Sequence, residues 1–290
     1  MSGLHFLPCL DSELRAAHRR LELDLSRDFA AGLGHSAVTA ARDGHYLTRD
    51  GRRVDWQNSV QVACAATASI TPESALPVGS RQFYPETSAQ VCNETTLAAA
   101  RRFVERGLRP VALNFANGIH PGGGFLYGAR AQEEVLCRSS ALFHTLIGNP
   151  MYAAHANRDL PDSTNWAIYS PDVPVFRTDD GTELPQPWLL SFITCAAPYA
   201  PSVGQPRSGD LLQERIHRVL AIAQSYGHSA LVLGAWGCGA FGNDPIRTAL
   251  DFRQALEGEF RGVFSEIVFA VTDWSPDRRT LGPFRDAFAA

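Results

Sequence analysis

From about residue 90 onwards, short apolar runs alternate with longer stretches in which apolar residues recur at helical spacing. The runs have the length of buried strands, and the alternation is typical of an α/β fold with a mostly parallel central sheet. The predicted strands are 90–93, 109–115, 166–170, 189–197, 229–236 and 265–273, with an irregular excursion over 171–187, and the predicted helices are 96–107, 133–146, 210–227, 245–260 and 279–290.

The first 88 residues follow a different pattern, in which one long amphipathic stretch precedes shorter segments and a proline-rich region. We therefore expect residues 1–88 to form a helical and hairpin extension that packs on a core of residues 89–290, as one compact unit. The elements predicted here are a helix over 11–31, a hairpin turning at Asp50-Gly51, a strand over 61–70 and an irregular segment over 71–87.

Two glycine-rich loops each follow a predicted strand. Gly122, Gly123 and Gly124 come after strand 109–115, and the sequence GCGAFGND comes after strand 229–236. In an open α/β sheet, ligands bind outside the carboxyl ends of the strands. We expect the two loops to lie at the same edge of the sheet and to hold one ligand between them.

The second loop has the composition of an anion site. Gly237, Gly239 and Gly242 allow successive backbone N–H groups to converge, and the helix that follows adds partial positive charge. A phosphate or diphosphate is the predicted guest, although a tight strand-to-helix turn would use the same residues. Phe241 within the loop either stacks on a ribose or base or packs against the core.

An acid pair, Glu133 and Glu134, opens the helix that follows the triple glycine. Acids favour the first helical turn for electrostatic reasons alone, but three glycines in succession indicate either a flexible turn or a backbone that passes very close to something. Adjacent helical residues point about 100° apart, so the pair cannot flank a sugar carbon as in ordinary glycosidases. We expect one carboxyl to act in the chemistry and the other to hold a hydroxyl, with one pKa raised by repulsion and desolvation.

Further polar candidates stand near the predicted strand ends. Asn114 and Asn117 could bond ribose hydroxyls, or serve the turn that begins there. Asp273 and Trp274 end the last strand and are candidates for a base pocket.

Composition excludes several classes of protein. The chain has 290 residues, is 45% hydrophobic and 19% charged, and carries a formal net charge of -4, which argues against a nucleic-acid binder with a broad basic surface. It contains no Lys, which excludes Schiff-base chemistry, and its nine His and six Cys match no metal-ligand spacing. With no signal peptide or membrane span apparent in the sequence, the expected location is the reducing cytoplasm.

The segments LNFANGIHPGGG, AQEEVLCRSSALF and GAWGCGAFGND, with the triple glycine seven residues ahead of Gln132-Glu133-Glu134, resemble the signature of the poly(ADP-ribose) glycohydrolases. The resemblance is to the compact microbial type and covers roughly residues 11–290. It implies a macrodomain-like three-layer α/β/α sandwich with a mixed central sheet, no cofactor and no metal. It also implies poly(ADP-ribose), ADP-ribose and ADP-ribosylated proteins as partners, and a place in the DNA damage response.

The resemblance also implies roles for individual residues. Glu134 would be the catalytic acid/base that protonates the departing ribose oxygen and then activates water, while Glu133 positions a ribose hydroxyl. Gln132 would support the loop or contact substrate. The binding residues implied are Gly122, Gly123 and Gly124 beside the acids, Gly237, Cys238, Gly239, Ala240 and Phe241 around the diphosphate and distal ribose, Asn117 at that ribose, and Glu94 and Thr95 at the adenine.

Three functions fit these residues. The first is hydrolysis of ribose–ribose bonds in poly(ADP-ribose). The second is non-catalytic reading of ADP-ribose on the same fold, which would not need a carboxyl beside the scissile bond. The third is hydrolysis of a nucleotide or sugar phosphate held by the same glycine loops.

Overall fold

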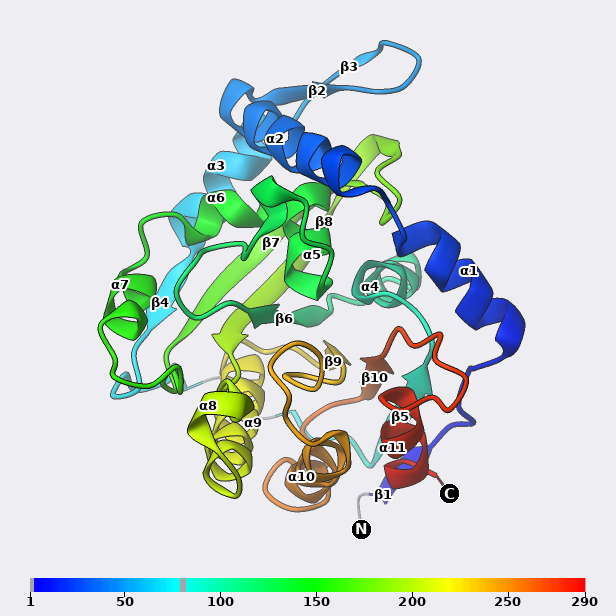
Figure 1. Ribbon diagram of the computed structural model, residues 1–290, viewed down its shortest axis with the longest axis vertical. Helices are drawn as coiled ribbons and strands as arrows, with labels where there is room; N and C mark the ends of the chain where they lie inside the picture. Colours follow the sequence, from blue (N-terminus) through cyan, green and yellow to red (C-terminus); the bar gives the residue numbers. More distant parts are fainter. Residues whose placement is uncertain (1–2, 79–81, 290) are drawn as a thin grey trace.

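A computed structural model describes residues 3–78 and 82–289, and its centre is an eight-stranded mixed sheet (Figure 1). The strand order is β1-β5-β10-β9-β6-β8-β7-β4; the pairs from β1 to β8 are parallel and the last two are antiparallel. A separate hairpin pairs β2 with β3. The strands are β1 Gly3–Phe6, β2 His45–Leu47, β3 Arg53–Asp55, β4 Ala68–Ile70, β5 Glu86–Cys92, β6 Val111–Ala116, β7 Ala167–Arg177, β8 Glu183–Ala196, β9 Ala230–Leu233 and β10 Glu266–Ala270.

Helices cover both faces of the sheet and bury a separate hydrophobic core on each, which gives three layers. Helices α2 to α6 lie on one side and α8 to α11 on the other (Figure 1). The sandwich and the mixed sheet agree with the predicted fold class. The helices are α1 Glu13–Leu23, α2 Arg27–Asp43, α3 Gln57–Ala66, α4 Thr96–Glu105, α5 Gln132–Ser139, α6 Leu142–Leu146, α7 Pro150–Ala156, α8 Ala200–Val203, α9 Arg207–Ser225, α10 Pro245–Glu257 and α11 Leu281–Ala287, with a short 3₁₀ helix η1 at Phe125–Tyr127.

Local sequence explains where the core helices begin. Thr95 caps α4 by accepting a hydrogen bond from the Ala98 N–H, and Asp244 caps α10 in the same way from Ile246. Pro245 occupies the first turn of α10, where its missing N–H costs nothing. The second glycine loop is therefore followed at once by a well-started helix.

Two predictions in the N-terminal region were wrong. The helix predicted over 11–31 is two helices, because Ser26 caps a new helix by accepting from the Phe29 N–H. The strand predicted over 61–70 is mostly helix α3, which buries Val60 and Ala63 on one face, and only Ala68–Ile70 is extended. The hairpin at Asp50-Gly51 is confirmed.

Two predictions in the core were also wrong. The excursion over 171–187 belongs largely to a long β7–β8 hairpin, whose ladder shifts register after Ser170 and so accommodates Pro171. The helix over 133–146 breaks at Ser140, which forms an isolated bridge with Val175. Both misreadings concern segments whose conformation depends on distant strands.

Strand β4 of the N-terminal region pairs with β7 of the region assigned to the core, and β1 pairs with β5. The boundary at residue 88 falls inside β5, and the division into extension and core stays a prediction.

The parallel part of the sheet determines where a site can form. The neighbouring strands β5, β10, β9, β6 and β8 all point the same way, so their carboxyl ends meet at one edge. Both glycine loops leave the sheet at this edge, after β6 and β9, as predicted.

Candidate active site

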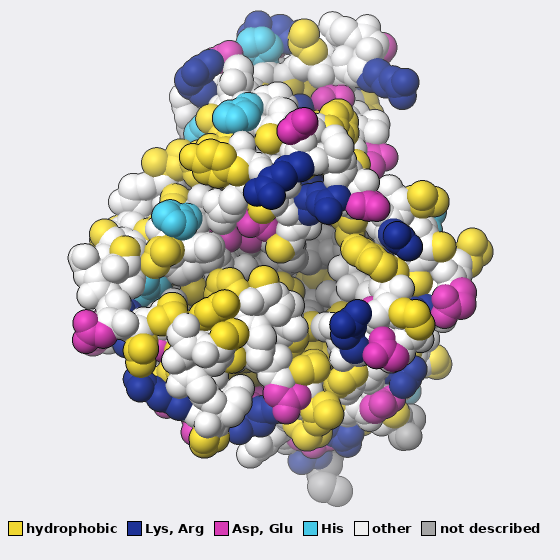
Figure 2. Space-filling view, in the orientation of Figure 1, with side chains coloured by type: hydrophobic (Ala, Val, Ile, Leu, Met, Phe, Trp, Pro, Cys, Tyr) yellow, Lys and Arg dark blue, Asp and Glu magenta, His cyan; other side chains and the backbone are white. Residues whose placement is uncertain are grey.

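A cavity of about 420 Å³ lies at the carboxyl edge of the parallel strands. Figure 2 shows this face of the molecule hollowed near its centre. The acid pair and the second glycine loop line the same cavity, together with the loop that follows β10. The lining residues are Phe115, Ala116, Asn117, Ala131, Gln132, Glu133, Glu134, Ala197, Ala235, Trp236, Gly237, Gly239, Ala240, Phe241, Ala270, Val271, Thr272 and Thr280.

Glu133 is fixed at the base of this cavity by the strand beneath it. Its Oε2 accepts a hydrogen bond of 2.7 Å from the Asn117 backbone N–H, and its Oε1 accepts one of 3.3 Å from Asn114 Nδ2. Burial raises the pKa of Glu133 to about 8, and the neighbouring carboxylate of Glu134 acts in the same direction, against the hydrogen bonds that lower it. The expected raised pKa within the pair is therefore that of Glu133.

Glu134 has one oxygen engaged and one available. Its Oε1 accepts a hydrogen bond of 3.0 Å from the Gly124 N–H, while Oε2 is buried and has no hydrogen-bond partner among the residues described. Gly123 passes directly against the pair, because a Cβ built there would lie 2.3 Å from Glu134 Oε1 and 3.1 Å from Glu133 Oε2. The backbone of the triple glycine therefore passes very close to the acid pair.

The second glycine loop lines the cavity with its backbone, and hydrogen bonds of Asn243 hold the loop in place. Asn243 Nδ2 donates to the Pro198 and Gly237 carbonyls, and Asn243 Oδ1 accepts from Ser208 Oγ at 2.5 Å. A Cβ added at Gly239 would meet nothing within 4 Å, so this position faces open space. Phe241 lines the cavity and makes an edge-on contact with Tyr199 at a centroid distance of 6.0 Å.

The chain was compared with known families and structures. Residues 35–178 match the model of the microbial-type PARG catalytic domain. The poly(ADP-ribose) glycohydrolase from Thermomonospora curvata has a similar structure: the TM-score is 0.84, the identity 39%, and the match covers 90% of this chain and 99% of that one. The chain belongs to the microbial poly(ADP-ribose) glycohydrolase family.

Two structures of such glycohydrolases with ligands are also similar. The Thermomonospora curvata enzyme bound to the inhibitor ADP-HPD has a TM-score of 0.82 at 39% identity, covering 89% of this chain and 99% of that one. The Deinococcus radiodurans enzyme in complex with ADP-ribose has a TM-score of 0.72 at 43% identity, covering 79% and 97%. These likenesses identify the fold as macrodomain-like. No curated protein sequence matches the chain significantly.

In this member of the family, Gln132 is bound to the sheet. Its Oε1 accepts from the Phe115 N–H at 2.9 Å, and its Nε2 donates to the Leu113 carbonyl at 2.8 Å and to Thr96 Oγ1 at 3.1 Å. The amide thus continues the hydrogen bonding of β6 and fixes the first turn of α5 against it. Of the two roles expected for Gln132, the contacts favour support.

Asn114 of β6 and Asn117, which directly follows that strand, lie differently. Asn114 is fully buried beneath the pair and donates to Glu133 and Thr194, so it does not reach the cavity. Asn117 lines the cavity, and its Oδ1 accepts from the N–H groups of Ile119 and His120, both at 2.9 Å. The turn therefore uses its oxygen, and its amide nitrogen is the group left for a ligand.

A second cavity of about 250 Å³ adjoins the first and shares Ala131, Gln132, Ala270 and Thr272 with it. Glu94 and Thr95 line this second cavity, as does Trp274. Glu94 is held by an ion pair with Arg102. Asp273 instead organises its own loop, with hydrogen bonds from the N–H groups of Ser275, Thr280 and Leu281.

Not every predicted binding residue lines a cavity. Cys238 is outside the main cavity lining, and its Sγ lies 3.5 Å from the Trp236 carbonyl oxygen, where burial raises the pKa of the thiol to about 12. The triple glycine does not line the cavity either, and it contacts the acid pair through Gly123 and Gly124. Sequence reasoning missed other lining residues, among them Ala197, Trp236, Thr272 and Thr280; the first three lie at or next to the ends of predicted strands, a signal that could have found them, whereas nothing marks Thr280.

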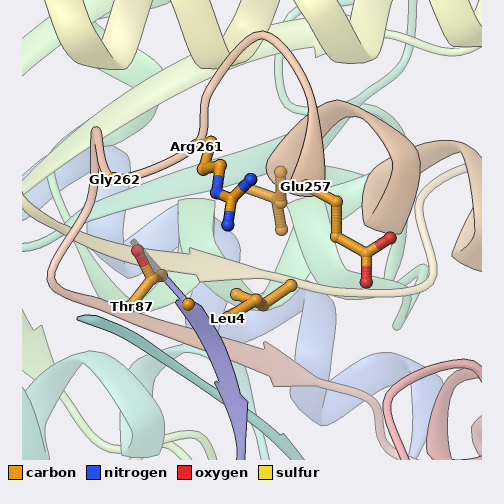
Figure 3. A pocket seen from close by; sticks show the side chains of 7 residues that line it. Leu4, Thr87, Glu257, Arg261 and Gly262 are labelled. Carbon is orange, nitrogen blue, oxygen red and sulfur yellow. The ribbon is translucent and has the colours of Figure 1, made fainter. Parts of the chain in front are cut away.

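A third cavity, of about 240 Å³, lies away from the acid pair Glu133 and Glu134. It lies beside β1, where Gly3, Thr87, Glu257 and Arg261 are among its lining residues (Figure 3). Thr87 Oγ1 donates to the Phe264 carbonyl, and Glu257 pairs with Arg253. Neither glycine loop reaches it.

Two kinds of feature are absent from residues 3–78 and 82–289. These residues contain no group of three or more His, Cys, Asp or Glu side chains that could hold a metal ion. None of their helices combines the length and the apolar character needed to cross a membrane.

The raised pKa of Glu133 predicts a pH dependence of stability. An acid whose pKa is about 8 when folded, against about 4.3 when unfolded, binds more protons in the native state between these values. Its contribution to the free energy of unfolding is complete below about pH 4.3 and is lost as the pH rises through about 8. Denaturant unfolding at several pH values should show a smaller decline for Glu133→Gln than for the unchanged protein, and equal declines would contradict the prediction.

Proposed function

We propose that the protein hydrolyses the ribose–ribose bonds of poly(ADP-ribose) and releases ADP-ribose. The observation that carries this proposal is the buried, unpartnered Oε2 of Glu134 in a cavity that the second glycine loop also lines. An acyl or phosphoryl transfer site would need a nucleophile or a cation at this point, whereas a glycosidic bond needs a carboxyl.

In the proposed reaction Glu134 acts first as an acid and then as a base. The bond between the anomeric carbon and the departing ribose oxygen breaks as the Glu134 proton moves to that oxygen. An oxocarbenium-like centre forms, and a water that loses a proton to Glu134 attacks it. Glu133, held by Asn114 and the Asn117 N–H, positions a ribose hydroxyl beside it.

The remaining roles follow the cavity lining. The backbone of Gly237, Gly239 and Ala240 would hold the diphosphate at the start of α10, and Phe241 with Asn117 would orient the distal ribose. Glu94 and Thr95 line the adjoining cavity, where the adenine is proposed to lie. Direct nucleic-acid binding is not expected of a chain with net charge -4.

The cellular location and the biological role of the activity stay predictions. All six cysteines are free thiols and lie within the described part, which supports a reducing cytoplasm. Action on ADP-ribosylated proteins and a place in the DNA damage response are carried over from the family likeness alone.

The alternative is a reader of ADP-ribose that does not cleave it. Incubation with labelled poly(ADP-ribose), followed by chromatography, distinguishes the two. Accumulation of free ADP-ribose supports the enzyme, and intact polymer retained by the protein supports the reader.

A substitution in the second loop tests the diphosphate role. Gly239→Ala adds a methyl group where nothing lies within 4 Å, so the free energy of unfolding should hardly change. A ligand whose phosphates approach this backbone would meet that methyl group, and we expect ADP-ribose affinity to fall about tenfold or more, since close approach is the reason for glycine there. Calorimetric titration measures this. Unchanged affinity with unchanged stability would remove the loop from the binding site.

A further inference from the structure

Residues 11–34, here called the strap, run past the loop after β10, which lines the main cavity, and past the glycine loop that lies behind the acid pair. The strap comprises Asp11 and Ser12, the whole of α1, the turn at 24–26 and the first half of α2. In Figure 1 this blue segment extends from the red loop after β10 to the green helix α5. Of the described residues that line the main cavity, none belongs to the strap, and Leu23 is the strap residue that lines the second cavity.

We propose that the strap positions the loop after β10 and the glycine loop behind the acid pair, so that its contacts at one end control substrate affinity and those at the other control turnover. The inference rests on the proposed function and adds to it the residues that keep the site in shape. It is carried by two independent sets of contacts, one at each end of the strap.

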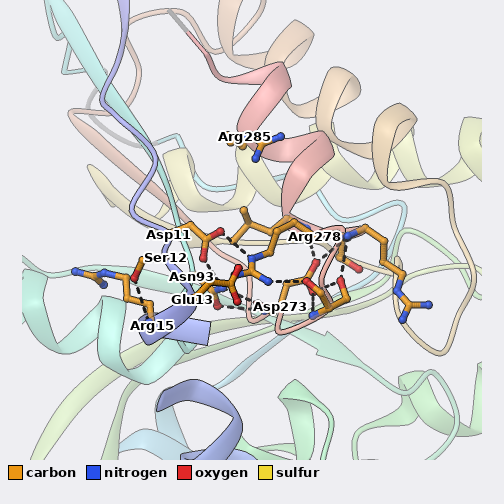
Figure 4. A network of polar contacts seen from close by, with 12 residues as sticks. Asp11, Ser12, Glu13, Arg15, Asn93, Asp273, Arg278 and Arg285 are labelled. Atoms are coloured by element: carbon orange, nitrogen blue, oxygen red, sulfur yellow. Dashed lines mark hydrogen bonds and ion pairs between the residues drawn. The ribbon is translucent and has the colours of Figure 1, made fainter. Parts of the chain in front are cut away.

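The first set fastens the loop after β10, which brings Val271, Thr272 and Thr280 to the cavity. Arg278 Nε donates to Asp11 Oδ2 at 2.8 Å, and its Nη2 donates to Glu13 Oε1 at 2.8 Å (Figure 4). The Arg278 side chain is only 8% exposed, so its ion pair with Asp11 is more than a surface contact.

A shared asparagine strengthens the same end. Asn93 Nδ2 donates to Asp11 Oδ1 at 2.8 Å and to the Asp273 carbonyl at 2.6 Å, and Asn93 Oδ1 accepts from the Asp273 N–H. Arg278 itself has a φ of 48°, a left-handed conformation that persists only where surrounding contacts enforce it. The loop after β10 therefore takes its shape from the start of the strap.

The second set fastens the glycine loop that precedes the acid pair. Arg130 Nη1 donates to Asp24 Oδ1 at 2.8 Å and to the Leu25 carbonyl at 2.5 Å, and Arg27 Nε donates to the Tyr127 carbonyl at 2.9 Å. Backbones approach closely here, because a Cβ at Gly128 would lie 2.1 Å from the Arg27 carbonyl oxygen.

This second contact leads directly to the acids. Gly34 of the strap packs on the Phe125 carbonyl, where a Cβ would lie 2.8 Å away, and the neighbouring Gly124 N–H holds Glu134 Oε1. Only Ala131, the N-cap of α5, separates Arg130 from the helix that carries Glu133 and Glu134. Loosening the strap at this end should displace the carboxyl relative to the scissile bond, and small displacements of catalytic groups cost up to about 10²-fold in rate.

The two ends therefore predict different kinetic effects. Arg278→Gln should raise KM, and the Kd for ADP-ribose, about tenfold with kcat nearly unchanged, since it releases a binding wall. Asp24→Asn, which releases Arg130 without changing a residue that lines either cavity, should lower kcat about tenfold or more with Kd nearly unchanged, since it loosens the acid-bearing loop. Arg101→Gln, which breaks an exposed i,i+4 pair with Glu105 on α4, is the matched control and should change neither constant.

The experiment is steady-state kinetics on poly(ADP-ribose) with calorimetric ADP-ribose titration and a melting curve for each variant. Should Arg278→Gln or Asp24→Asn fail to fold, Asp11→Asn and Arg27→Gln weaken the same two ends of the strap and are expected to show the same split. The strap proposal would be overturned by strap variants whose kcat and Kd equal those of Arg101→Gln. It would also be overturned if every strap variant lowered kcat and raised Kd together. Absence of ADP-ribose release by the unchanged protein would instead overturn the proposed function.

Discussion

Glu134→Gln is expected to lower turnover of poly(ADP-ribose) by about 10²–10⁴-fold, the usual contribution of general acid/base catalysis. The amide cannot deliver a proton to the departing ribose oxygen or take one from water. Its oxygen can still accept the hydrogen bond that Glu134 Oε1 receives from the Gly124 N–H at 3.0 Å. The loop and the rest of the cavity should therefore stay in place, and ADP-ribose should bind almost as before.

Kinetics on labelled polymer and calorimetry with ADP-ribose test the two halves of this prediction separately. Glu105→Gln makes the same chemical change at an exposed acid on α4 and serves as the control. A Glu134→Gln protein with a near-normal rate would remove this carboxyl from the mechanism. Loss of binding together with turnover would indicate that Glu134 supports the cavity instead.

The edge of the sheet where the site lies could be predicted from sequence because it follows from chain order. A strand, a glycine loop and a helix occur in succession at 111–139 and again at 230–257. Parallel neighbours bring such loops to one edge whatever the side chains are. Apolar run length and helical spacing are local signals, and they located where these elements begin, although the helix predicted over 133–146 breaks at Ser140.

What could not be predicted depends on contacts between distant segments. The alanine-rich stretch of α3 has the apolar character of a strand, and its helical form follows from burying Val60 and Ala63. The β7–β8 hairpin tolerates Pro171 because the ladder shifts register beside it. Neither fact can be read from a window of a few residues.

The same limit applies within the site. Nothing in the sequence indicates that the Gln132 amide bonds to the backbone of β6, or that Asn114 lies under Glu133 instead of facing a ligand. These contacts require the relative position of α5 and β6, which packing sets. The Asp11–Arg278 pair joins residues 267 positions apart and had no sequence signal at all.

Gly123→Ala is the second substitution for which we expect a large effect, because it acts on the acids through the backbone. Gly123 has a φ of 58°, and its new Cβ would lie 2.3 Å from Glu134 Oε1. The left-handed conformation costs an alanine about 1 kcal/mol, and the contact forces either the loop or the carboxyl to move. Moving the carboxyl away from the scissile bond should lower kcat by about 10²-fold.

Gly51→Ala separates backbone strain from displacement of the acids. Gly51 also has a left-handed φ, of 79°, but a Cβ there would meet nothing within 4 Å, and it lies in the β2–β3 hairpin outside the cavity. Denaturant unfolding should show a loss of about 1 kcal/mol for Gly51→Ala with its rate intact, and a larger loss for Gly123→Ala. Equal rates for the two variants would mean that the triple glycine serves only the turn, and that the position of Glu134 does not depend on the backbone pressed against it.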